Sequence, residues 1–81
     1  MKRNEAEQLV SMLQGPGFSH WVRDARVQEA MTGEMSVLCY VTRLSALLVA
    51  ELERVSQQFG VMWQAEPSRT TNFILVRFVE A

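Results

Sequence analysis

The sequence predicts one α+β domain over residues 1–81, a two-layer sandwich with two helices on one face of a four-stranded, largely antiparallel sheet. Two segments, beginning near residues 4 and 44, carry apolar residues at helical spacing. Each is followed by two segments that alternate in polarity or are rich in β-branched residues. The predicted order is therefore α-β-β-α-β-β, which suggests two αββ halves over residues 4–42 and 44–80.

The first helix is predicted from a capping signal and an apolar stripe. Asn4 is followed three residues later by Glu7, the spacing of a capping box. The segment Gly15-Pro16-Gly17 ends the helix, because glycine adopts the left-handed conformation easily and proline cannot continue the hydrogen-bond ladder. The residues that share the buried face are Ala6, Leu9, Val10 and Leu13.

The segment 18–31 allows two interpretations. As a strand, it places Trp21, Ala25 and Val27 on one face, and the turn 32–34 joins it to the next strand as a hairpin. As a helix over residues 19–31, capped by Ser19, it would give the order α-α-β-α-β-β. We favour the strand because the segment that follows it, Met35 to Thr42, alternates clearly.

A second helix is predicted from Leu44 to Phe59, closed by Gly60, and its first half is apolar nearly all round. The last hairpin is predicted from strands at 61–66 and 72–80. Because the final strand is apolar on both faces, it is expected to be central in the sheet or to meet a partner on its second face.

Composition excludes several classes of protein. Hydrophobic residues make up 48% of the chain and charged residues 21%, which is typical of a globular domain. The net charge of −1 provides no general attraction to nucleic acid or to an anionic membrane. No signal peptide is visible, and the longest apolar run is too short to span a membrane, so a cytoplasmic protein is expected.

The sequence contains few candidates for catalytic or metal-binding residues. Cys39 and His20 are the only residues of their kinds, which excludes an internal disulfide and argues against a zinc site. They are also the only pair resembling a nucleophile and its base, but Cys39 lies within a predicted strand, where an inert buried thiol is expected. The acidic residues are scattered along the chain. We therefore predict no catalytic, cofactor-binding or metal-binding residue and no enzyme activity.

A surplus of apolar surface leads to the functional hypothesis. Two short helices cover only one face of a sheet, and large exposed apolar patches mark interaction sites. The residues predicted to form that surface are Leu38, Tyr40, Leu47, Val49, Ile74, Val76 and Phe78. The sequence thus predicts a non-catalytic protein-interaction module that forms a homodimer, with binding to a different protein as the alternative. It is expected to act as regulator, adaptor or inhibitor of a larger bacterial or phage protein.

Two alternatives remain open at this stage. One is an apolar pocket for a small molecule, which requires aromatic and methionine side chains around a cleft; the candidates are Trp21, Trp63, Met12, Met31, Met35 and Met62. The other is a nucleic-acid-binding sheet face built from arginines and aromatics; its candidates are Arg23, Arg26, Arg43, Arg69, Arg77 and Tyr40, with Trp21 or Trp63. Nine acidic residues against eight basic ones make this second alternative unfavourable.

Overall fold

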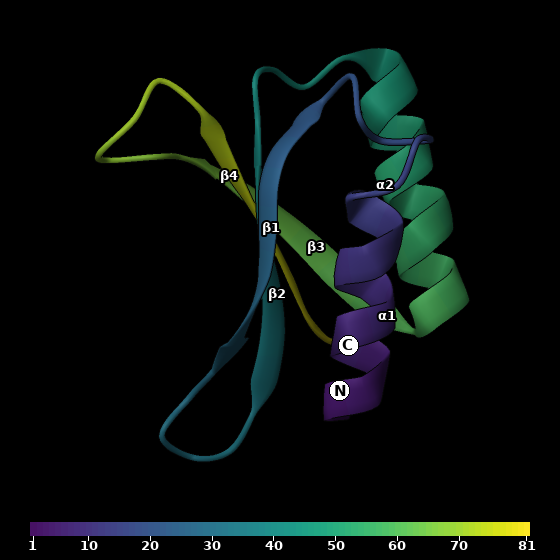
Figure 1. The fold of residues 1–81 in the computed structure, drawn as a ribbon, viewed down its shortest axis with the longest axis vertical. Coiled ribbons are helices and arrows are strands. Elements are labelled where there is room, and N and C mark those ends of the chain that lie inside the picture. Colours follow the sequence, from purple (N-terminus) through teal and green to yellow (C-terminus); the bar gives the residue numbers. More distant parts are fainter.

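Two helices lie on the same side of a four-stranded antiparallel sheet in the computed structural model, which describes residues 1–81 (Figure 1). The predicted α-β-β-α-β-β sandwich is confirmed, and segment 18–31 contains a strand rather than a helix. The elements are α1 (Arg3–Leu13), β1 (Val22–Glu29), β2 (Met35–Val41), α2 (Ala46–Phe59), β3 (Val61–Pro67) and β4 (Ile74–Glu80).

The strand order in the sheet is β1-β2-β4-β3, and each neighbouring pair is antiparallel. The final strand is therefore central, as its two apolar faces predict. Since β2 and β3 both run opposite to β4, they are parallel to each other, and α2 makes the crossover between them. Such a long connection is what parallel strands require.

The order also has an approximate symmetry. In each αββ half, the first strand lies at the edge of the sheet and the second lies inside. The two inner strands form the seam between the halves, where Cys39 pairs with Val76 and Val37 with Phe78. This arrangement is compatible with an internal duplication, which remains a prediction.

Both helices begin at residues other than those predicted. Helix α1 starts at Arg3, so the predicted Asn4–Glu7 capping box is wrong. The residue that returns to the helix start is Glu5, whose carboxylate accepts a hydrogen bond from the Lys2 backbone N–H at 3.0 Å. Helix α2 starts two residues later than predicted, because the Ser45 hydroxyl accepts a hydrogen bond from the Leu48 N–H at 3.2 Å.

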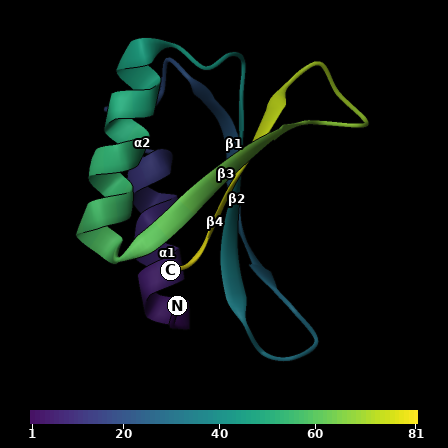
Figure 2. The same ribbon diagram turned by 180° about the vertical axis from the view of Figure 1, so that it is seen from behind.

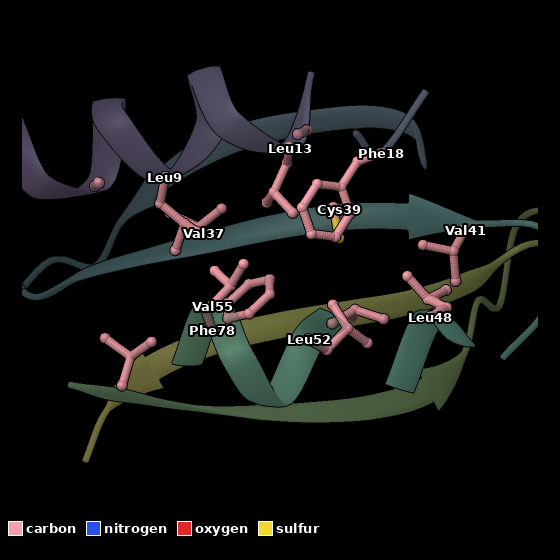
Figure 3. Close-up of a cluster of buried hydrophobic side chains, with 14 residues drawn as sticks. Leu9, Leu13, Phe18, Val37, Cys39, Val41, Leu48, Leu52, Val55 and Phe78 are labelled. Carbon is pink, nitrogen blue, oxygen red and sulfur yellow. The ribbon is translucent and has the colours of Figure 1, made fainter. Parts of the chain in front are cut away.

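The core lies between the helices and one face of the sheet (Figure 3). The inner strands β2 and β4 contribute their buried side chains to one side of it, and the apolar stripes of both helices fill the other. The fully buried side chains with the largest volumes are Phe78, Leu9, Leu13, Leu48, Leu52, Val37, Val41, Val55, Val76 and Cys39. Large-to-small substitutions at such positions typically cost about 2 to 5 kcal/mol, on the order of half the stability of a small domain.

Both hairpins bend away from the helical layer. Figures 1 and 2 show the tip of the β1–β2 hairpin and the tip of the β3–β4 hairpin projecting on the side of the sheet opposite the helices, at its two ends. In the β1–β2 tip, Gly33 has a φ of 90°, a conformation that other residues rarely adopt. The two tips therefore border the uncovered face of the sheet.

Candidate interaction surface

The sheet face opposite the helices is built from three rows of side chains that run across the strands. We call this surface the open face. The strand register places Gln64, Arg77, Leu38 and Arg26 in the central row. One flanking row contains Glu66, Leu75, Tyr40 and Asp24, and the other contains Met62 and Val79 beside Ser36 and Gln28.

Leu38 is less exposed than its position on this face suggests. It is only 6% exposed, although no helix covers it. It lies in register between Arg26 and Arg77, and long arginine stems commonly cover neighbouring apolar surface. The Arg26 guanidinium also lies 5.9 Å from the centre of the Tyr40 ring and donates to the Tyr40 hydroxyl at 3.5 Å. The apolar area open to solvent is therefore smaller than the sequence indicates.

Arg77 carries a hydrogen-bond donor that the chain itself leaves unused. Its Nε is buried and has no partner, while one terminal nitrogen lies 3.9 Å from a Glu66 carboxylate oxygen. Buried donors are nearly always paired in folded proteins, because leaving one unpaired costs about 1 to 3 kcal/mol. The Arg77 side chain is 40% exposed through atoms other than Nε, so an incoming acceptor meets the guanidinium at its exposed part, and the buried Nε becomes reachable only if the side chain shifts.

The open face is hollowed rather than flat. A hollow of about 550 Å³ lies at the end of the sheet, between the β1–β2 hairpin and the end of β4. Its lining includes Gln28, Ser36, Arg77 and Val79 from the open face and Met1, Met35 and Glu80 from the helical side. A second, of about 120 Å³, is lined by Gln64, Ala65, Glu66 and Arg77. A third, of about 310 Å³, lies next to the β3–β4 tip and is lined in part by Tyr40 and Leu75. This face therefore suits a partner that projects into it.

The structure divides the predicted interaction residues between two faces of the sheet. Leu38 and Tyr40 lie on the open face. Val76 and Phe78 are both 0% exposed in the core, and Ile74 packs against that core, so their assignment to an exposed surface was wrong. The physical reason is the alternation of β4, in which these residues face the helices.

The residues of the other face of β4 were not assigned to this interaction surface, and only Arg77 among them was named, as a candidate for nucleic-acid binding. Leu75, Arg77 and Val79 point to the open side of the sheet. The signal was present in the sequence, because Arg77 is the one charged residue between Phe73 and Val79. In a strand with two apolar faces, the face that carries the charge is the one nearer to solvent.

The two predicted residues on α2 do not join this surface. Leu47 is 73% exposed and Val49 is half-buried, and both belong to the helical layer rather than to the open face. The start of α2 is thus more exposed than its apolar composition predicts. Helical geometry turns Leu48 inward, where it is 0% exposed, and leaves its neighbour Leu47 outside.

Cys39 and His20 lie in different environments. Cys39 is 0% exposed on the core face of β2, and burial raises the pKa of its thiol from 9.0 to about 12. His20 is exposed in the loop before β1. The expected burial of Cys39 is confirmed, and the thiolate form that a nucleophile requires is strongly disfavoured. The structure contains no group of three or more His, Cys, Asp or Glu side chains that could hold a metal ion.

The tryptophans and methionines do not line one cleft. Four of the six candidates, Trp21, Trp63, Met12 and Met35, pack against the core. Met31 is fully exposed in the β1–β2 tip, and Met62 is 45% exposed on the open face. The Trp63 indole N–H donates to a Glu53 carboxylate oxygen at 2.9 Å and thereby ties β3 to α2. The tryptophans are thus on the opposite side of the sheet from Tyr40, Arg26 and Arg77.

Comparison with protein-family models, with curated proteins and with solved structures found no match to this chain. None of its helices has the length and apolar character needed to cross a membrane.

Proposed function

We propose that this protein is a non-catalytic protein-interaction module that binds another protein through the open face of its sheet. In this role it would act as a regulator, adaptor or inhibitor of a larger protein. The observation that carries the proposal is the hollowed face between two projecting hairpin tips, with the partly exposed Arg77 side chain in its central row.

The side chains of the open face indicate which groups a partner must present. Tyr40, Leu75 and Val79 are half-buried and offer apolar contact. Arg77 offers a planar guanidinium, which suits a carboxylate or a backbone carbonyl. The partner segment should therefore combine an apolar side chain with an oxygen acceptor. Asp24 and Glu66 lie in the row next to the arginines, so the face has mixed charge and is not a basic track for a phosphate backbone.

Site-specific photo-crosslinking tests the proposal. A photoreactive amino acid at Tyr40, on the open face, should form an adduct with one defined protein in extracts of the source cells. The same group at Gln58, exposed on α2, is the control for nonspecific contact and should not form that adduct.

Substitution of Arg77 then tests whether the open face makes the contact. Arg77→Met keeps a stem over Leu38 but removes the guanidinium, so affinity for the identified partner should fall about tenfold or more. Circular dichroism of the variant should match that of the original protein. Equal adducts at Tyr40 and Gln58, or an affinity that Arg77→Met leaves unchanged, would refute the proposal.

A further inference from the structure

The two edges of the sheet are unequally protected. Exposed edge strands invite pairing with another chain, and proteins guard them with charges, bulges and covering side chains. The edge at β1 has features of this kind, which disfavour pairing with another chain. The register shifts between Val22 and Asp24, which places Arg23 in a bulge. The Gln14 side-chain amide donates to the Ala25 carbonyl at 3.2 Å, and β1 carries the charged residues Arg23, Asp24, Arg26 and Glu29.

The edge at β3 lacks these features. The register of β3 with β4 is regular over its whole length, and no side chain forms a hydrogen bond to the backbone of β3. Glu66 is the only charged residue in the strand. Pro67 closes the strand, which limits pairing beyond that point.

The outward backbone groups of β3 can be assigned from one hydrogen bond. The Ser68 N–H donates to the Phe73 carbonyl at 3.1 Å, next to the Pro67–Ile74 pair. Hydrogen-bonded and non-hydrogen-bonded pairs alternate along an antiparallel ladder. Gln64 therefore bonds inward to β4, whereas Trp63 and Ala65 direct their N–H and C=O groups outward. These groups have no partner within the chain.

We infer that a second copy of this chain pairs with β3 in the antiparallel direction, joining two four-stranded sheets into one of eight strands. The two-fold axis would pass beside Gln64. Trp63 would then exchange backbone hydrogen bonds with Ala65 of the partner subunit. Both helical layers would lie on one side of the joined sheet, and both open faces on the other.

The sequence of β3 is compatible with pairing to the β3 strand of a second copy of the chain. In this register Glu66 lies opposite the partner's Met62, so no like charges meet across the interface. Pro67 has no backbone N–H to donate, and in this register its carbonyl would accept a hydrogen bond from the backbone N–H of the partner's Val61. The inference uses a different surface from the proposed function and does not depend on it. Arg77→Met should accordingly leave the dimer intact.

Proline substitution tests the use of this edge. Ala65→Pro removes an outward N–H but no bond to β4, so the subunit should fold while the dimer is lost. Glu29→Pro at the end of β1 is the matched control and should remain dimeric; the exposed Arg3–Glu29 ion pair that it removes contributes little. Sedimentation velocity over a range of concentrations measures the oligomeric state of both variants. Circular dichroism checks that both are folded. A monomeric original protein, or a dimer that persists in Ala65→Pro, would overturn the inference.

A charge at Gln64 tests the register. Gln64→Glu places the new carboxylates of the two subunits directly opposite each other across the two-fold axis. Within each chain the new carboxylate lies beside Arg77, so folding should not suffer. The dissociation constant of the dimer should rise about tenfold at low salt and recover partly at high salt. If Ala65→Pro dissociates the dimer while Gln64→Glu has no effect, this register is wrong, because a pairing centred on Trp63 would leave the two charges apart.

Discussion

The buried Ser56 side chain leads to a specific prediction about the stability of the protein. It lies in α2, is 5% exposed, and its hydroxyl oxygen has no hydrogen-bond partner. An unpaired buried hydroxyl costs about 1 to 3 kcal/mol, and alanine is a better helix former than serine by about 0.5 kcal/mol. Loss of the packing made by the oxygen offsets part of this gain. We therefore expect Ser56→Ala to stabilise the protein by about 1 to 2 kcal/mol.

Urea denaturation measures this change, and Ser11→Ala is its control. Ser11 is exposed in the corresponding last part of α1, so its replacement changes helix propensity without changing a buried group. Ser11→Ala should stabilise by about 0.5 kcal/mol at most. In thermal unfolding, the Ser56→Ala midpoint should rise by about 4 to 16 °C, from the 4 to 8 °C per kcal/mol typical of this size.

A Ser56→Ala variant no more stable than Ser11→Ala would refute the reasoning. It would show that the Ser56 hydroxyl is satisfied in solution, for example by the carbonyl one turn earlier in the helix. A destabilised variant would show that packing around the oxygen outweighs its desolvation.

Two further predictions concern Cys39 and Gly60. Because burial raises the pKa of Cys39 from 9.0 to about 12, the unfolded chain releases the thiol proton first as pH rises. Stability should fall by about 1.4 kcal/mol per pH unit between these values, relative to Cys39→Ala, in urea denaturations at several pH values; equal slopes would contradict the burial of the thiol. Gly60 ends α2 with a φ of 66°, so Gly60→Ala should destabilise by about 1 to 2 kcal/mol. Gly17, without positive φ or close neighbours, should accept alanine with a change under about 0.5 kcal/mol, and similar losses at both glycines would argue against the left-handed cap.

The architecture could be predicted from the sequence because most segments have only one plausible period. The alternation around Val37 and Val41 and the stripe of Leu48, Leu52 and Val55 each match one kind of element. Segment 18–31 was ambiguous because the bulge at Arg23 interrupts its alternation. The bulge brings Val22, rather than Arg23, to the core face, whereas Trp21 lies in the turn before β1 and packs against the core from there.

The candidate surface was harder to predict than the fold. A strand that is apolar on both faces does not show which face meets the helices, and Phe78 was therefore assigned to the wrong side. The shielding of Leu38 depends on its cross-strand neighbours Arg26 and Arg77, which lie far away in the sequence. Pairing register determines such neighbours, and the local sequence pattern contains little information about it.

The seam between β2 and β4 has a consequence for how the chain folds. Each hairpin joins strands that are close in sequence, whereas the seam pairs residues as distant as Val37 and Phe78. Closing the longer loop costs more chain entropy, so we expect the hairpins to form as local units and the seam to form after them. Without the seam, neither half has an inner neighbour for its second strand or a complete apolar layer beneath its helix. The two halves should therefore gain and lose their structure in one cooperative transition.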